Sequence, residues 1–283
     1  MIKITIFGHP TKDGTIKTSL SSTQMFTAAF VNGFRHIGYD VNCINAATCN
    51  PESFLEKTDI VLVHTYAPFW VDKIQPILKK HKENYLLSSS FMEVVYDTDI
   101  PFTYDNRNGK SHVINAPCLL DCLKIENKIK KTILLDHGWP VANALDVSEK
   151  ILNTLSEKNY SVSKIGDPSL SPEKIIHKAS FLSYLENTSQ FENFIVTHKG
   201  SYNHSVVDMV ARGTRVISPR GYVPKNLVEL FNIPEFDTMD EMLNVLSKPY
   251  VASEWELKRD LCTDMSDAVN IMNEQFINYI NRK

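Results

Sequence analysis

The residue types best suited to chemistry gather between positions 194 and 224. A buried-type apolar run comes first, a polar loop follows, and a helix is predicted to begin at His204–Ser205. The first turn of a helix presents free backbone N–H groups and the positive end of the helix dipole, which suits an anion such as a diphosphate. Asp208 lies one turn further, where its carboxylate can accept hydrogen bonds from a ribose diol. The alternative is an ordinary strand–helix crossover that binds no ligand.

This stretch resembles the donor-binding half of two-domain (GT-B) glycosyltransferases. Those enzymes carry an acidic residue followed by Ala-Met-Ala-x-Gly and then an apolar strand, and this chain has Asp-Met-Val-Ala-Arg-Gly at 208–213 followed by Thr-Arg-Val-Ile-Ser at 214–218. The resemblance implies that Asp208 binds the ribose. It also implies that the loop around Asn203 binds the diphosphate. Many members have a second acidic residue eight positions earlier, where this chain has Gly200, so the paired-acid motif is incomplete.

Two further loops are expected at the same edge of the sheet, because ligands of doubly wound sheets lie beyond the carboxyl ends of the strands. One contains Gly138 and Trp139 and the other contains Gly166; a structural Trp and a plain turn are the alternatives. Positive groups would stabilise a departing diphosphate. The residues predicted to bind the donor are Gly138, Trp139, Gly166, Lys199, Ser201, Asn203, His204, Ser205, Asp208 and Arg220.

An inverting sugar transferase also needs a base that removes the proton of the acceptor hydroxyl. Side chains at or after the predicted strand ends of the first half have the right chemistry, although each has a purely structural role as its alternative. The candidates are His9, His64, Glu93 and Asp97.

The order of the elements predicts an α/β fold. Strands are expected at 2–7, 41–46 and 59–64, with a helix at 22–36, and the second half repeats this alternation. We expect two Rossmann-like domains that face a central cleft: residues 1–122 for the acceptor and residues 123–283 for the donor. A helix is expected to open at Ser171, and a mostly helical tail over 253–280 is expected to pack back toward the first domain.

Composition narrows the class of protein. The 283 residues carry a net charge of −3, and no apolar run approaches the roughly 20 residues of a membrane helix, so we expect a cytoplasmic protein without a membrane partner. The five scattered cysteines predict free thiols, not a zinc site. A divalent metal could assist the reaction, but no acidic pair is dedicated to one.

These observations favour a glycosyltransferase, hexosyl or pentosyl, that uses a UDP or GDP sugar. The acceptor could be a hydroxymethylated base in DNA, since the chain resembles compact phage DNA-modifying sugar transferases in size and plan. The loop 101–112 has the basic and aromatic residue types for that task. A glycan or small-molecule acceptor is the alternative. A sugar-nucleotide epimerase and a non-catalytic nucleotide-binding module are competing functions, and the oligomeric state is left open.

Overall fold

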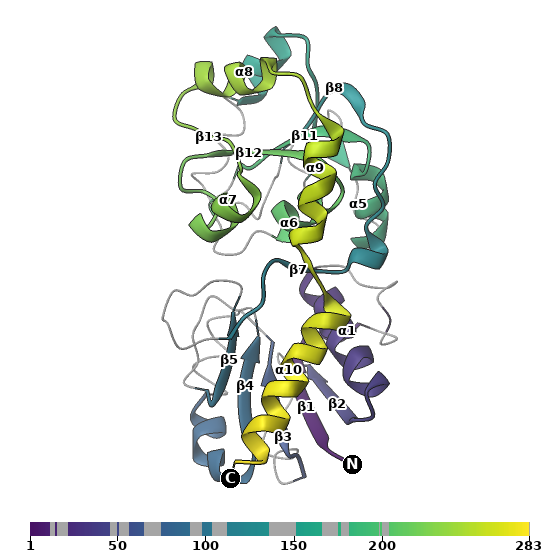
Figure 1. Cartoon of the computed structure of the whole chain (residues 1–283), viewed down its shortest axis with the longest axis vertical. Coiled ribbons are helices and arrows are strands. Elements are labelled where there is room, and N and C mark those ends of the chain that lie inside the picture. Colours follow the sequence, from purple (N-terminus) through teal and green to yellow (C-terminus); the bar gives the residue numbers. More distant parts are fainter. Residues whose placement is uncertain are drawn as a thin grey trace. The chain divides into compact units, whose positions relative to one another are not determined.

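A computed structural model describes most of the chain. The described residues are 1–11, 15, 22–45, 50, 57–64, 75–90, 98–103, 112–135, 151–165, 175–176, 181–197, 199 and 204–282. The chain divides into two compact units (Figure 1). The first contains Met1–Leu119 together with Thr263–Lys283, and the second contains Leu120–Cys262.

The first unit is built on a parallel sheet with the strand order β2-β1-β3-β4-β5-β6. Apolar β-branched and aromatic residues dominate its central strands, and β3 is buried along its whole length, as expected for a sheet covered on both faces. The strands are β1 (Lys3–Gly8), β2 (Asp40–Asn45), β3 (Ile60–Val63), β4 (Leu86–Ser90), β5 (Ile100–Thr103) and β6 (His112–Val113).

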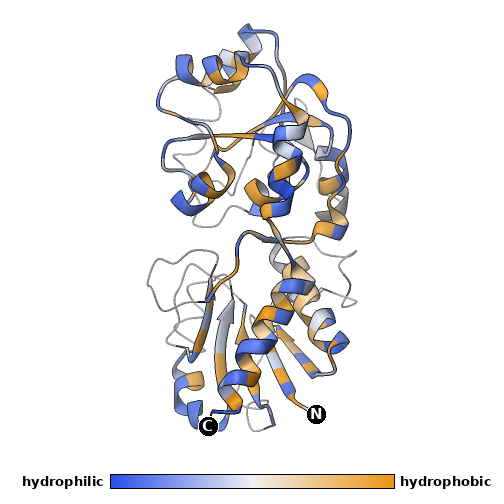
Figure 2. Cartoon of the chain, in the orientation of Figure 1, coloured by the Kyte–Doolittle hydropathy of each residue, from blue (hydrophilic) through white to orange (hydrophobic). Residues whose placement is uncertain are grey.

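Two helices of the first unit pack side by side, although they come from opposite ends of the chain. Helix α1 (Ser22–His36) contacts β1 and β2, and the terminal helix α10 (Met265–Ile280) contacts α1 and β5 (Figure 1). The Phe34 and Phe276 rings stack with their centroids 6.0 Å apart. The buried residues of α10 recur every three or four positions, and Figure 2 shows hydrophobic and hydrophilic residues along the same helix.

The second unit contains a parallel sheet with the order β10-β9-β8-β11-β12-β13. Apolar side chains from its strands and from two helical segments form one core, which includes Ile133, Ile195, Ile217 and Met242. The strands are β8 (Ile129–Leu135), β9 (Ser161–Ile165), β10 (Ile175–Ile176), β11 (Phe191–Ile195), β12 (Arg215–Pro219) and β13 (Glu235–Phe236).

The helices of the second unit alternate with its strands. Residues 151–157 are helical before β9. The others are α5 (Phe181–Thr188), α6 (His204–Ala211), α7 (Lys225–Phe231), α8 (Met239–Ser247) and α9 (Ala252–Glu256), followed by a 3₁₀ turn, η4 (Leu257–Leu261). A capping box starts α8: the Thr238 hydroxyl accepts the Glu241 N–H, and the Glu241 carboxylate accepts the Thr238 N–H.

Short strands also pair where the chain leaves the first unit and returns to it. Strand β7 (Pro117–Cys118) and strand β14 (Thr263–Asp264) lie parallel to each other. A 3₁₀ turn, η3 (Leu120–Cys122), follows β7, and another, η2 (Lys82–Asn84), precedes β4.

The predicted α/β class is confirmed. The three strands and the helix that were predicted for the first half are also confirmed, to within a residue or two at their ends. One expectation is wrong. Ile175–Ile176 form a strand beside β9 where a helix was expected to have opened, because two β-branched residues suit a sheet edge. The tail is mostly helical as expected, and its last helix, α10, packs on α1; η4 and β14 interrupt it, because the pairing of β14 with β7 extends the backbone.

Candidate functional site

The strand order of the second sheet marks a place where ligands bind in open α/β folds. Its first strand, β8, lies in the middle, with β9 and β10 on one side and β11, β12 and β13 on the other. Such a reversal leaves a crevice beyond the carboxyl ends of the two central strands, here β8 and β11. The loops that follow Leu135 and Ile195 therefore start at this switch point.

Helix α6 begins after the loop that follows β11. Its residues Val206–Ala211 are buried, whereas His204 and Ser205 in its first turn are half-buried. The amino-terminal end is therefore the part of α6 that a ligand can approach. Its backbone N–H groups and helix dipole favour an anion at that end.

Asp208 is the acidic residue within this helix. It is 2 % exposed, and its neighbours Val207 and Met209 are completely buried. A carboxylate this deeply buried is normally held by hydrogen bonds or ion pairs, because removing its charge from water is costly. The structure therefore places a buried acidic group one turn behind the accessible end of α6.

Thr197 was not among the predicted site residues. It lies directly beyond β11, is 1 % exposed, and its hydroxyl oxygen has no hydrogen-bond partner in the described part of the chain. An unsatisfied buried hydroxyl costs about 1–3 kcal/mol, so such an atom is suited to a ligand. The available sequence signal was a polar residue immediately after an apolar run at the carboxyl edge of the sheet.

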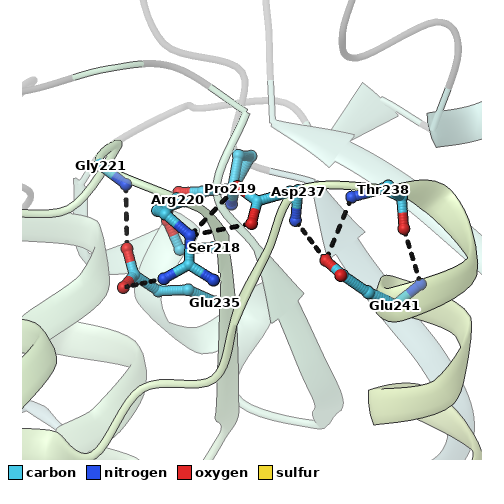
Figure 3. A network of polar contacts seen from close by, with 8 residues as sticks. All are labelled: Ser218, Pro219, Arg220, Gly221, Glu235, Asp237, Thr238 and Glu241. Carbon is cyan, nitrogen blue, oxygen red and sulfur yellow. Dashed lines mark hydrogen bonds and ion pairs between the residues drawn. The ribbon is translucent and has the colours of Figure 1, made fainter.

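Arg220 follows β12 at the same edge of the sheet and forms a polar network (Figure 3). Its Nε atom lies 2.9 and 3.1 Å from the two carboxylate oxygens of Asp237, and its Nη1 atom lies 3.7 Å from Glu235 Oε2. The hydrogen bond that Arg220 donates to Asp237 raises the pKa of Arg220, and the negative charge of the same carboxylate is the next largest cause. The predicted cation is thus accompanied by two carboxylates that the sequence did not associate with it, because β13 was not predicted.

The remaining predicted donor-binding residues divide into two groups. Lys199 is exposed in the segment between β11 and α6. The others, Gly138, Trp139, Gly166, Ser201 and Asn203, lie outside the described residues.

In the first unit, the structure brings two of the predicted bases to neighbouring strand ends. His9 follows β1 and His64 follows β3, and these strands pair in parallel at the point where the strand order reverses. The His9 N–H donates to Thr27 Oγ1 at 3.1 Å. His9 is half-buried, and burial lowers its pKa, which favours the neutral imidazole, the form that can accept a proton.

His64 has the surroundings of a core residue. It is 2 % exposed, its Nδ1 lies 3.0 Å from Ser90 Oγ, and its ring packs against Phe26 and Phe30. Its pKa is lowered to about 4, chiefly by burial and in smaller part by the positive charge of a protonated His9, while hydrogen bonding with Ser90 and Thr23 acts in the opposite direction. No hydrogen bond reaches Nε2 from the described residues. Glu93 and Asp97, the two predicted acidic bases, lie outside the described residues.

Within the residues that the structure describes, no group of three or more His, Cys, Asp or Glu side chains could hold a metal ion. None of the described helices is both long and apolar enough to cross a membrane.

No protein-family model matches the sequence, and no curated protein matches it. Solved structures do match over the full chain. A glycosyltransferase from Rickettsia africae superposes with a TM-score of 0.68 at 12% identity, covering 100% of this chain and 99% of the other. HepE from Anabaena, in complex with UDP and glucose, gives 0.65 at 9% identity and covers 100% of both chains.

An alpha-glucosyltransferase in complex with UDP and a 13-mer DNA matches with a TM-score of 0.53 at 9% identity, over 95% of this chain and 94% of that one. UDP-N-acetylglucosamine 2-epimerases are also among the matches. At these identities the likeness concerns the fold. The chain therefore has the two-domain α/β (GT-B) fold that these transferases and epimerases share.

Proposed function

We propose that this protein is a cytoplasmic glycosyltransferase that moves a hexosyl or pentosyl group from a UDP or GDP sugar to an acceptor hydroxyl. The observation that carries the proposal is Asp208, a buried carboxylate one turn inside a helix that starts at the switch point of a Rossmann-ordered sheet. Structures of the same fold hold UDP or UDP-glucose, which supports this class of donor.

In this proposal each part of the edge has one task. The backbone N–H groups of His204 and Ser205 receive the diphosphate, together with Ser201 and Asn203, and Asp208 accepts the ribose hydroxyls. The loops that contain Gly138, Trp139 and Gly166 contact the rest of the nucleotide. Lys199 and Arg220 balance the negative charge that grows on the diphosphate as it leaves. We assign no residues as dedicated metal ligands, and a divalent ion could assist the departure of the diphosphate without being required.

The reaction itself is a displacement at the anomeric carbon of the sugar. The acceptor oxygen forms a bond to that carbon, the bond from the carbon to the diphosphate oxygen breaks, and the diphosphate leaves with the electron pair. A base takes the proton of the acceptor hydroxyl. We assign this role to His9 and not to His64, because His64 is buried in an aromatic cluster and its Nδ1 already contacts Ser90. Glu93 and Asp97 remain competing bases.

The experiment for the general proposal is incubation of the protein with radiolabelled UDP- and GDP-sugars. Release of the nucleotide, by transfer or by slow hydrolysis, is the expected result. A protein that binds nucleotide but never releases it from any sugar would be the non-catalytic module instead. His9→Gln, which keeps a polar side chain of similar length, is expected to reduce turnover with little change in donor affinity.

For the acceptor, we propose a hydroxymethylated base in DNA. A structure of the same fold contains both UDP and DNA, which supports this choice. A DNA mobility shift tests it: binding that weakens steeply with salt is expected. Absence of binding at low salt would remove DNA and leave a glycan or a small molecule as the acceptor.

A sugar-nucleotide epimerase is the second candidate function, because epimerase structures share the fold. The two activities differ in their need for an acceptor. Incubation with UDP-sugar alone would give an epimeric UDP-sugar from an epimerase, whereas a transferase returns only unchanged or hydrolysed donor.

A further inference from the structure

We propose that Asp237 is a positioning residue for Arg220, and that it holds the guanidinium at the edge of the sheet with its terminal nitrogens turned to the donor diphosphate. The inference rests on the proposed function of this site. It assigns a role to a carboxylate that follows the two-residue strand β13, which sequence patterns did not predict.

The hydrogen bonds of Arg220 leave its outer nitrogens available. Nε donates to both carboxylate oxygens of Asp237, at 2.9 and 3.1 Å. Nη1 lies 3.7 Å from Glu235 Oε2, an ion-pair distance that is longer than a hydrogen bond. In the described part of the chain, Nη1 and Nη2 make no hydrogen bond. A guanidinium has five N–H donors in a planar fork, so most of them remain for a phosphate group.

The backbone that carries Arg220 is held as well (Figure 3). The Arg220 N–H donates to Phe236 O at 2.9 Å, and the Tyr222 N–H closes a turn onto Pro219 O at 3.1 Å. Gly221 has a φ of 73° and donates its N–H to Glu235 Oε1 at 2.9 Å. The backbone of Arg220 and its Nε atom are therefore both restrained, which lowers the entropy lost when a ligand is bound.

Asp237 is in turn held by the start of helix α8. Its N–H donates to Glu241 Oε2 at 2.7 Å, and Glu241 also completes the capping box with Thr238 (Figure 3). The order of dependence therefore runs from the helix cap to Asp237 and from Asp237 to Arg220. An exposed ion pair contributes little to stability. We therefore infer that this network orients the Arg220 guanidinium rather than stabilising the fold.

If Asp237 acted only through its negative charge, its removal would change anion binding in the opposite direction from the one that the positioning role predicts. Arg220, Glu235 and Asp237 together carry a net charge of −1, which repels a diphosphate. If the carboxylates only neutralised Arg220, removing the charge of Asp237 would strengthen anion binding. If Asp237 orients Arg220, the same substitution weakens binding.

Calorimetric titration with UDP and with GDP decides between these roles. Using whichever nucleotide binds the wild type, Arg220→Ala is expected to weaken binding about tenfold. Asp237→Asn is expected to weaken it about two- to fivefold. In the Arg220→Ala background Asp237→Asn should weaken binding no further. With Arg220 present, Asp237→Glu, which keeps a carboxylate, should retain more of the affinity than Asp237→Asn. Thermal unfolding of each variant checks that the fold is intact.

Glu229→Gln is the matched control, because it removes an exposed carboxylate that pairs with Lys225 on α7. It should leave the affinity unchanged. Asp237→Asn binding as tightly as the wild type, or more tightly, would overturn the positioning role while leaving the proposed donor site intact. A wild-type protein that binds neither nucleotide would instead refute the proposed function, and this inference with it.

Discussion

A Cβ atom at Gly8 would lie only 2.7 Å from the hydroxyl oxygen of Thr27, so helix α1 crosses the end of β1 too closely for any larger residue unless Thr27 shifts. The same hydroxyl accepts the His9 N–H at 3.1 Å and donates to Thr23 O at 2.9 Å. The close packing of α1 on β1 therefore also fixes the position of the His9 backbone, and His9 is the proposed base.

Gly8→Ala is expected to destabilise the protein. The added methyl group must displace Thr27, and overpacking of this kind costs about 1–3 kcal/mol. The free energy of unfolding from a denaturant titration measures the effect. Because Thr27 supplies the clash, Gly8→Ala should cost less in a Thr27→Ala background, and equal costs in both backgrounds would contradict the packing argument.

His64 makes stability depend on pH. Its pKa in the folded protein is about 4, below the unfolded value of 6.5, because burial disfavours the charged ring. The unfolded chain therefore binds more protons between these two values, so stability is lost as pH falls from about 6.5 toward 4. The full difference is on the order of 3 kcal/mol. His9 contributes in the same direction, since burial lowers its pKa too.

Denaturant titrations at pH 7 and pH 5 test this dependence. His64→Asn can keep a hydrogen bond to Ser90 but does not titrate, so its stability should change less between the two pH values than that of the wild type. His36→Asn removes an exposed histidine of α1 and serves as the control. A His64→Asn variant with the full wild-type pH difference would show that His64 is not the group responsible.

Arg259 joins three carbonyl oxygens of the second unit. Its Nη1 donates to Leu123 O and to Ala211 O, both at 2.7 Å, and its Nη2 donates to Leu120 O at 2.8 Å. Ala211 is the last residue of α6, so the cation also lies at the negative end of that helix dipole. Arg259→Ala should lower the free energy of unfolding by about 2 kcal/mol or more, since hydrogen bonds to charged groups are strong.

Thermal unfolding measures that loss, with Lys225→Ala, at an exposed position of α7, as a control that should change little. Lysine lacks the planar guanidinium that reaches all three carbonyl oxygens, so Arg259→Lys should retain only part of the stability that Arg259→Ala loses. Complete recovery by lysine would mean that charge alone, and not the geometry of the three bonds, holds this segment.

Asp208→Asn is expected to weaken UDP or GDP binding about tenfold, because the neutral amide is a poorer acceptor for the ribose hydroxyls. The substitution is nearly isosteric, so the melting temperature shows whether a loss of affinity comes from the site or from unfolding. Unchanged affinity in a folded Asp208→Asn variant would remove the carboxylate from the donor site.

Local signals explain which parts of the architecture could be predicted. The stretch from β11 to β12 combines an apolar run, a helix start and a closing glycine, Gly213, and each of these acts within a few residues. Strand β13 has only two residues and forms because it pairs with β12, so the sequence has no alternating pattern long enough to predict it. The partners of Arg220 were missed for the same reason, since Glu235 and Asp237 become its neighbours only through that pairing.

The tail shows the same limit. Its apolar residues follow a helical period, yet Thr263–Asp264 pair with β7, a contact between segments more than 140 residues apart in sequence. Tertiary pairing of this kind overrides local helix propensity. At the site, the acid of α6 was recognisable from its motif, whereas the burial of His64 depended on the aromatic residues of α1.

A crystal structure of the protein soaked with UDP or a UDP-sugar tests the central claim most directly. The account predicts that the diphosphate lies within hydrogen-bonding distance of the backbone N–H groups of His204 and Ser205, with the ribose hydroxyls on Asp208. Nucleotide bound elsewhere, or an Asp208 carboxylate enclosed entirely by the protein's own side chains in the complex, would contradict it.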